Sequence, residues 1–208
     1  AITAVIGPNG AGKSTLFNLI SGALRPLTGQ VILDGQDITG QPPQKLLAAG
    51  LARSFQISNV FPQLSVYENL RCSVLWSLGY GYSFVRLVGS LRDAKARTDA
   101  LLERLGLAAQ AQTLAAHLSY AQQRALELGI TLGSGADVLL LDEPTNYLDI
   151  VSMRWLERFL KDWEGEMIVI SHDRWFLDRI ATHILAYEGE SKWFWFEGNF
   201  ESYEENKV

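Results

Sequence analysis

The fold of this chain is decided by one short segment, Gly7-Pro8-Asn9-Gly10-Ala11-Gly12-Lys13-Ser14. The segment follows an apolar run, residues 2–6, that is typical of a buried parallel strand. It precedes a helical pattern that places Leu16, Leu19 and Ile20 on one face. A strand, a turn of the form G-x-x-x-x-G-K-[ST] and a helix, in that order, indicate a phosphate-binding loop rather than an incidental glycine-rich turn.

The glycines of this loop let successive backbone N–H groups turn inward around phosphate oxygens, and the helix N-terminus adds partial positive charge. We expect Lys13 to reach the outer phosphates of a nucleotide and the Ser14 hydroxyl to ligate Mg²⁺. The predicted nucleotide contacts of this region are Gly7, Pro8, Asn9, Gly10, Ala11, Gly12, Lys13, Ser14 and Thr15.

Two adjacent carboxylates, Asp142 and Glu143, end a second apolar run at residues 138–141. Such a pair is common at strand ends, but its position after a phosphate-binding loop indicates a catalytic role. We expect Asp142 to hold Mg²⁺, directly or through water. Because side chains alternate along a strand, Glu143 should point elsewhere and polarise a water molecule against the γ-phosphate.

The remaining pattern alternates strands and helices, which predicts an α/β domain with a mostly parallel sheet flanked by helices. Further strands are expected at residues 30–33, 51–55, 167–170 and 183–187, and an alternating aromatic run covers 192–196. Residues 66–132 are mostly helical. The predicted organisation is one P-loop NTPase domain over residues 1–208, with a core at 1–63 and 135–208 and an inserted helical subdomain at 64–134.

Composition excludes several classes of protein. The net charge of −5 argues against nucleic-acid binding mainly through the chain's own positive field, although a local patch could still dock on a ribosome. The single cysteine, Cys72, cannot form an internal disulfide and fits a reducing compartment. The most apolar stretch, residues 72–85, is bracketed by Arg71 and Arg86 and is too short to span a bilayer. We therefore expect a cytoplasmic chain that reaches membranes only through a partner.

A third motif, Leu118-Ser119-Tyr120-Ala121-Gln122, opens a predicted helix for which Ser119 is a suitable N-cap. Alone it would indicate an ordinary capped helix. After the first two motifs, however, it resembles the signature Leu-Ser-Gly-Gly-Gln of ABC (ATP-binding cassette) ATPases. The resemblance implies that Ser119, Tyr120, Ala121 and Gln122 contact the γ-phosphate of ATP bound to the opposite subunit.

Other positions match markers of the same family in the same order. Gln56 resembles the Q-loop glutamine that senses Mg²⁺ and the attacking water, and residues 146–149, ending at Asp149, resemble the D-loop. His172 follows a predicted strand and resembles the switch histidine that contacts the γ-phosphate. The resemblance therefore implies Glu143, His172 and Gln56 as catalytic residues, Asp149 as a nucleotide-site residue, and Ser14, Gln56 and Asp142 as metal ligands.

The family resemblance also implies a mechanism. Two ATP molecules would lie head to tail between two such domains, each site combining Lys13, Asp142, Glu143 and His172 of one copy with Ser119 of the other. Binding of ATP would close the pair, and hydrolysis with product release would open it. A monomer should therefore hydrolyse ATP poorly.

Two branches of the family are represented. Residues 1–145 resemble the ATPase subunits of branched-chain amino acid importers, whereas residues 146–208 resemble ABC-F translation factors, which act on ribosomes. We favour an importer ATPase that binds membrane permease subunits through its Q-loop and helical subdomain. The alternatives are an ABC-F-like factor that binds the ribosome, or a recombined chain, joined near residues 144–146, that binds nucleotide without a physiological partner.

Two departures from the family pattern bear on activity. Ala121 stands where the family usually has glycine, and its methyl group could hinder close approach of backbone to phosphate unless φ is negative there. The family's N-terminal antiparallel strands, with their adenine-stacking aromatic residue, are missing before residue 1. We therefore expect weakened nucleotide affinity and weak hydrolysis, and an inert fragment remains the non-enzyme alternative.

Overall fold

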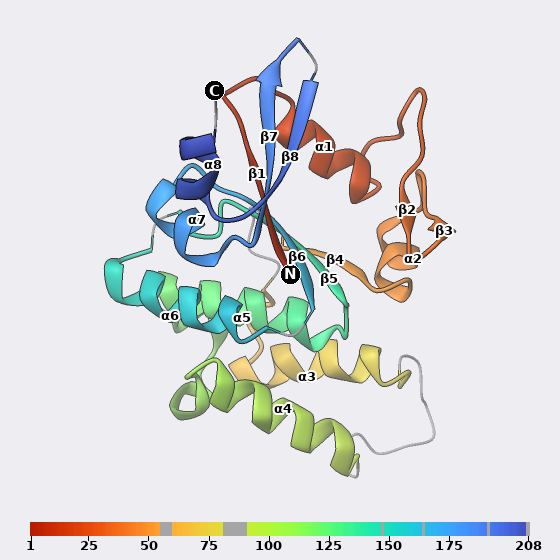
Figure 1. The fold of residues 1–208 in the computed structure, drawn as a ribbon. Coiled ribbons are helices and arrows are strands. Elements are labelled where there is room, and N and C mark those ends of the chain that lie inside the picture. The colour runs from red at the N-terminus through yellow and green to blue at the C-terminus, as the bar shows by residue number, and fades with distance from the viewer. Residues whose placement is uncertain (55–59, 81–90, 147, 164, 191, 207–208) are drawn as a thin grey trace. The chain divides into compact units, whose positions relative to one another are not determined.

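The computed structural model describes residues 1–54, 60–80, 91–146, 148–163, 165–190 and 192–206 (Figure 1). The chain divides into two compact units, one made of residues 1–56 and 137–208 and the other of residues 57–136. Gln56 lies outside the described residues, so its predicted role has no structural counterpart here.

The first unit is built on a six-stranded sheet with the order β4-β5-β6-β1-β7-β8. The neighbouring strands are parallel except β8, which forms an antiparallel hairpin with β7. The strands are β1 (Ile2–Ile6), β4 (Leu51–Ser54), β5 (Val138–Asp142), β6 (Glu166–Ile170), β7 (His183–Gly189) and β8 (Lys192–Glu197). This confirms the predicted α/β fold with a mostly parallel sheet.

In the described residues of this unit, five helices and a small hairpin accompany the sheet. The helices are α1 (Lys13–Ile20), α2 (Pro43–Ala48), α6 (Ile150–Lys161), α7 (Arg174–Ile180) and α8 (Phe200–Asn206). The hairpin pairs β2 (Ile32–Leu33) with β3 (Gln36–Asp37), so the strand predicted at 30–33 is shorter than expected. In Figure 1, α8 lies beside the β7–β8 hairpin. Its start is marked by Asn199, whose side chain accepts a hydrogen bond from Ser202 N at 3.0 Å, and we did not predict this helix from the sequence.

The core of the first unit explains why the sheet and α1 form together. Phe17 of α1 is fully buried and belongs to one cluster with Val5, Leu140 and Ile170 of the central strands. Removing each such side chain from water stabilises the fold by roughly 1.5–3 kcal/mol. The central strands β1, β5 and β6 are mostly buried, and their sequences are predominantly apolar, as expected for strands covered on both faces of a parallel sheet.

The second unit is helical. Its described residues form α3 (Val66–Ser77), α4 (Arg92–Arg104) and α5 (Tyr120–Gly133), together with short 3₁₀ turns at Ala108–Gln110 and Ala115–His117. Helix α3 packs against both α4 and α5. A side chain at Gly129 of α5 would collide with Leu70 and Leu105, so this glycine allows the helices to approach closely. Among the described helices, none is long and apolar enough to cross a membrane.

Candidate functional site

Three loops meet at the carboxyl edge of the sheet. Strand β6 lies between β1 and β5 and is parallel to both, so the segments that follow these strands emerge side by side. They line a cavity of about 440 Å³. Its lining residues are Asn9, Gly10, Ala11, Gly12, Lys13, Ser14, Thr15, Asp142, Glu143, Asn146, Ile170 and His172. Most of the predicted site is therefore gathered in one place.

The loop after β1 has the backbone that an anion site requires. Gly10 and Gly12 have φ values of 84° and 87°, in the left-handed region that favours glycine. Empty space surrounds both positions, so it is backbone conformation and not crowding that calls for glycine there. Gly12 precedes α1 without a side-chain cap, which leaves the first N–H groups of that helix available for a ligand.

Lys13 is the principal cation of the loop. Only 7% of the residue is exposed, and its Nζ donates hydrogen bonds to the carbonyl oxygens of Gly7 at 2.7 Å and Pro8 at 3.0 Å. The ammonium group is thus held at the mouth of the glycine loop by weak neutral acceptors. A phosphate oxygen would be a stronger, charge-assisted acceptor for the same group.

Asp142 is the last residue of β5 and is buried. Its Oδ2 accepts a hydrogen bond at 3.2 Å from Nη2 of Arg53, on the neighbouring strand β4. The Asp142 side chain is 3% exposed and that of Arg53 is 13% exposed. The carboxylate is therefore held in place by a charged partner that is itself largely shielded from solvent.

Glu143 follows Asp142 with an unusual backbone. Its φ of 48° lies in the left-handed region, which costs a residue other than glycine on the order of 1 kcal/mol or more. The chain leaves the strand at this point, because β5 ends at Asp142. The two carboxylates do point to different partners, but the left-handed backbone, and not the expected strand alternation, separates them.

The carboxylate of Glu143 faces His172, which follows β6. The backbone N–H of His172 donates to Oε2 of Glu143 at 3.3 Å, and the imidazole Nε2 lies 3.6 Å from Oε1. Oε1 is buried and has no hydrogen-bond partner among the described residues. Burial raises the pKa of Glu143 above its usual value, which suits a group that must accept a proton.

The signature residues lie in the second unit. Ser119 caps α5: its Oγ accepts from Gln122 N at 3.4 Å, and Gln122 Oε1 accepts from Ser119 N at 3.0 Å, which is a capping box. Tyr120 and Ala121 form the first turn of this helix, and Ala121 has a negative φ. None of these four residues lines the cavity described above. Asp149 does not line it either; its side chain caps α6 by accepting from Ser152 N at 2.7 Å.

The residues of the cavity fit a magnesium nucleotide. Among the described residues, no three His, Cys, Asp or Glu side chains gather into a protein-only metal site. Mg²⁺ in phosphate chemistry does not need such a cage, since it binds through one or two carboxylates and substrate oxygens. Ser14 and Asp142 are hard oxygen ligands that line the same cavity, so they could supply the protein's share.

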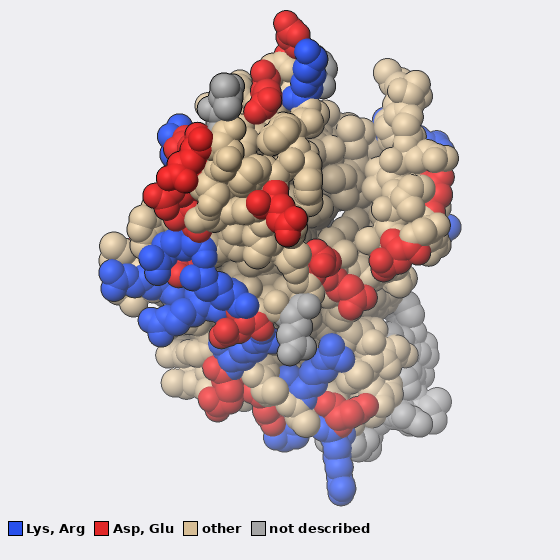
Figure 2. Space-filling model, in the orientation of Figure 1, with Lys and Arg blue, Asp and Glu red and all other residues tan. Residues whose placement is uncertain are grey.

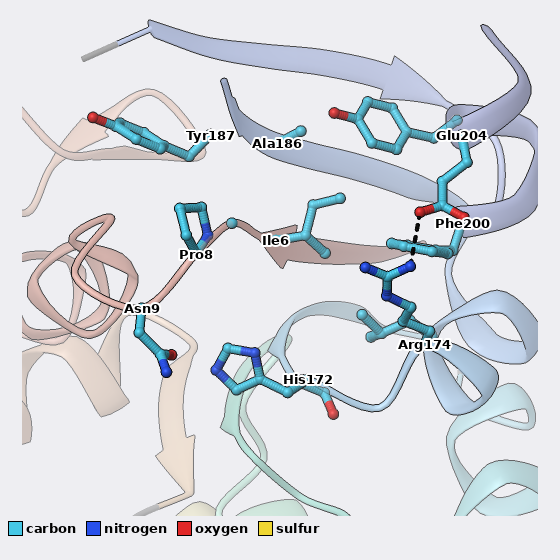
Figure 3. Close-up of a pocket in the computed structure, with 13 residues that line it drawn as sticks. Ile6, Pro8, Asn9, His172, Arg174, Ala186, Tyr187, Phe200 and Glu204 are labelled. Atoms are coloured by element: carbon cyan, nitrogen blue, oxygen red, sulfur yellow. Dashed lines mark hydrogen bonds and ion pairs between the residues drawn. The ribbon is translucent and has the colours of Figure 1, made fainter. Parts of the chain in front are cut away.

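A second cavity of about 440 Å³ borders the start of the glycine loop (Figure 3). Pro8 and Asn9 border it at one end, and Arg174 and Phe200 border it at the other. Arg174 Nη1 is 3.1 Å from Glu204 Oε1, and its guanidinium lies 5.4 Å from the centre of the Phe200 ring. This arginine already has a carboxylate partner, whereas Lys13 of the first cavity contacts neutral carbonyl oxygens, so the first cavity is the better phosphate site.

Two polar residues near the site were not among the predicted ones. Asn146 lines the cavity directly, and Arg53 holds Asp142. Asn146 stands in the segment that resembles a D-loop, so its position in the sequence could have identified it as a site residue. Arg53 carried a weaker signal, an arginine that follows the apolar residues Leu51 and Ala52 in a predicted strand. Such a residue is rarely buried without a charged partner.

A mostly parallel sheet with a glycine loop after one strand, an acidic pair after another and a histidine after the strand between them defines a P-loop nucleotide-binding domain. Comparison with known proteins agrees: residues 1–146 match the family described as "ABC transporter". The chain therefore belongs to the family of ABC ATP-binding domains.

Two curated relatives represent the two branches. The chain is 40% identical over 211 residues to the energy-dependent translational throttle protein EttA of Mycobacterium tuberculosis, covering all of this chain and 34% of that protein. It thus spans about a third of the length of that relative. It is 32% identical over 182 residues to the branched-chain amino acid transport ATP-binding protein LivG of Escherichia coli, covering 83% of this chain and 71% of that protein.

A solved structure shows the same fold. The ADP conformation of MJ1267, an ATP-binding cassette of an ABC transporter, aligns with a TM-score of 0.80 and 25% identity, covering 99% of this chain and 84% of the other. Both resemblances noted in the sequence, to importer ATPases and to ABC-F proteins, are thereby confirmed.

Proposed function

We propose that this domain hydrolyses ATP to ADP and phosphate. The observation that carries the proposal is the convergence of Lys13, Asp142, Glu143 and His172 on one cavity from three different loops. Lys13 and the free N–H groups of α1 would bind the phosphates. His172, whose side chain is 57% exposed, would contact the terminal phosphate from the opposite side.

In this proposal Glu143 receives the proton of the attacking water. Its Oε2 is anchored by the His172 N–H, which leaves the buried Oε1 to accept a hydrogen bond from water. Mg²⁺ held by Ser14 and Asp142 would neutralise charge that develops on the phosphate oxygens. General base catalysis of this kind contributes about 10²–10⁴-fold to a rate.

The proposal includes a head-to-tail pair of domains, as the family resemblance implies. Ser119 would complete the site of the opposite copy, so one chain holds only half of each site. This arrangement permits a complementation experiment. Lys13→Ala and Ser119→Glu should each abolish hydrolysis alone, because every site of either homodimer lacks one required group.

Mixed dimers of the two variants contain one site with both defects and one site with none. An equal mixture should therefore recover up to about a quarter of the wild-type phosphate release. Turnover per chain of the wild type should also fall on dilution below the dimer dissociation constant. Recovery of no activity on mixing, together with turnover that does not depend on concentration, would contradict the paired site.

As the physiological partner we propose the permease of an importer, with the chain acting at the cytoplasmic face of the membrane. LivG supports this reading, since the match covers most of that protein's length. The resemblance of residues 56–132 to importer ATPases also supports it, because the Q-loop and helical subdomain are the family's permease-binding surface.

A ribosomal partner is the second candidate, and two observations favour it. The alignment to EttA spans the whole chain at higher identity than the alignment to LivG. Figure 2 shows Lys and Arg side chains gathered over α6 and α7. The exposed cations of these helices are Arg154, Arg158, Lys161, Arg174 and Arg179. In the described part of the chain, Arg154 and Arg158 have no acidic partner, so they are available to phosphates of RNA.

One pair of measurements separates these partners. Co-sedimentation with 70S ribosomes that weakens in Arg154→Ala/Arg158→Ala would support the ribosomal partner, whereas ATP-dependent co-purification with an importer permease in membranes would support the transporter. If the chain is a composite without a physiological partner, it should hydrolyse ATP but bind neither ribosomes nor an importer permease.

A further inference from the structure

Arg53 makes more polar contacts than any role in sheet packing requires. Its Nη2 donates to Asp142 Oδ2 at 3.2 Å, and its Nη1 donates to Asn18 Oδ1 at 2.6 Å and to Ser21 Oγ at 3.0 Å. Its guanidinium also lies 5.8 Å from the centre of the Phe17 ring. The side chain is 13% exposed, so these contacts form largely away from water.

The partners of Arg53 belong to two elements that must act together. Asn18 lies in α1, and Ser21 is the C-cap residue of the same helix. Asp142 ends β5, which pairs with the strand that carries Arg53 in parallel register. The helix supplies Ser14 at its first turn and the strand supplies Asp142, the two residues that fit the metal. One guanidinium therefore joins the two halves of the proposed metal site.

We propose that Arg53 is a positioning residue for Mg²⁺: it fixes the Asp142 carboxylate relative to the helix that carries Ser14. This proposal rests on the proposed ATPase function, because it concerns the same metal. Arg53 binds Oδ2 of Asp142 with a planar, forked group whose orientation is set by its bonds to α1. A carboxylate oriented in this way enters the metal's coordination sphere, directly or through water, without first giving up rotational freedom.

Stability alone does not account for the arrangement. A buried ion pair is weak evidence for stabilisation, because the cost of removing two charges from water often exceeds their attraction. In contrast, groups that orient a metal ligand typically change metal affinity or activity by about 10–100-fold when they are replaced. A stabilising role would make loss of Arg53 lower the stability of the fold, whereas a positioning role would make it lower the affinity for Mg²⁺.

The test follows nucleotide binding as a function of free Mg²⁺, using a fluorescent ATP analogue, so that it does not depend on turnover. In wild type the dissociation constant of the ATP analogue should fall as Mg²⁺ is added. In Arg53→Met, which replaces the arginine by a long side chain without charge, the half-saturating Mg²⁺ concentration should rise about 10–100-fold. The dissociation constant in EDTA should stay within about twofold of wild type, because the phosphate loop is untouched. Arg92→Met, an exposed change on α4, is the matched control and should behave as wild type.

Two further variants show whether Arg53 acts through Asp142. Arg53→Lys keeps the charge but replaces the planar fork with a single ammonium group, so it should retain only part of the Mg²⁺ dependence. Arg53→Met in an Asp142→Asn background should add no further change, because the group that it orients is gone. If Arg53→Met does not fold, Asn18→Ala removes one anchor of the guanidinium and should raise the half-saturating Mg²⁺ in the same direction.

The outcomes distinguish this proposal from the proposed function. If wild-type binding does not respond to Mg²⁺, or if Asp142→Asn leaves the response intact, the metal site itself is wrong. If Asp142→Asn abolishes the response while Arg53→Met, Arg53→Lys and Asn18→Ala all keep it, or if the Arg53 and Asp142 effects are additive, the positioning role is wrong and the ATPase proposal stands.

Discussion

His172 donates its backbone N–H to the side chain of Glu143, so the loop after β6 holds the acidic residue that follows β5. The same two side chains approach within 3.6 Å through Nε2 and Oε1. These two contacts connect segments that are 29 residues apart in sequence. Any movement of the histidine loop would change where the carboxylate points.

Replacement of Glu143 by glutamine should stop hydrolysis and spare binding. The amide keeps the shape of the side chain but cannot accept a proton from water, so phosphate release should fall at least 10²-fold. Affinity for a fluorescent ATP analogue should stay within a few-fold of wild type. Glu190→Gln, whose parent side chain is 84% exposed, is the matched control and should keep full turnover. Residual turnover above one tenth of wild type would remove Glu143 from the proposed role.

Replacement of Lys13 by alanine should weaken nucleotide binding. The ammonium exchanges two carbonyl acceptors for charged phosphate oxygens, and a hydrogen bond to a charged group is worth about 1.5–3 kcal/mol. The dissociation constant for ATP should therefore rise about 10–100-fold by isothermal titration calorimetry. Lys192→Ala removes a lysine that is 77% exposed and should leave affinity unchanged.

The ion-pair cluster around Glu157 should make the stability of the fold depend on pH in the acidic range. Glu157 is 4% exposed and accepts hydrogen bonds from Arg179 at 2.7 Å and Lys161 at 2.8 Å. The Arg179 hydrogen bond, followed by that of Lys161, lowers the pKa of Glu157 from 4.5 to about 2. Because the folded-state pKa is depressed, the stabilisation is complete above pH 4.5 and is lost as pH falls toward about 2.

Urea unfolding of Glu157→Gln and wild type tests this pH dependence. At pH 7 the variant should be less stable by roughly 1–3 kcal/mol, a range that allows for the half-exposed partners. The difference should shrink steadily below pH 4.5, the unfolded-state value. A difference that stays constant down to pH 2.5 would show that lost packing, and not charge, explains the variant.

Ala121→Gly should change hydrolysis little. Ala121 lies in the first turn of α5 with a negative φ, so its methyl group imposes no backbone strain. We expect turnover within about threefold of wild type, which corresponds to roughly 0.6 kcal/mol in the barrier. Thermal unfolding should show a small loss of stability, because glycine costs about 0.5–1 kcal/mol relative to alanine inside a helix. A tenfold gain in turnover would mean that the methyl group does hinder the partner's phosphate.

The sequence was most informative where function needs a fixed order of residue types. Lys13, Asp142 and His172 could be placed at the ends of three strands because apolar runs and their polar ends are local patterns. The sheet and the helical segment followed from the same periodicities. Ser119 was predicted as a helix cap, and it is one.

Other features depend on contacts that no local pattern encodes. The bond between Arg53 and Asp142 joins residues 89 positions apart and requires β4 and β5 to be neighbours. The left-handed backbone of Glu143 is unfavourable for its residue type, so propensity points away from it. Helix α8 is short and depends on burial of Phe200 and Tyr203, the latter against the aromatic side chains of β8.

The hydroxyl group of Ser119, at the start of α5, limits the substitutions that this position can accept. A serine side chain has two lone pairs and one proton, and capping the helix uses only a lone pair of Ser119. The proton remains available for an oxygen on another molecule. Aspartate caps helices as well as serine does, yet it would bring a negative charge and no proton. Ser119→Asp should therefore leave the isolated chain folded, and in the proposed pair of domains the defect should emerge only when a second chain presents its bound nucleotide to this helix.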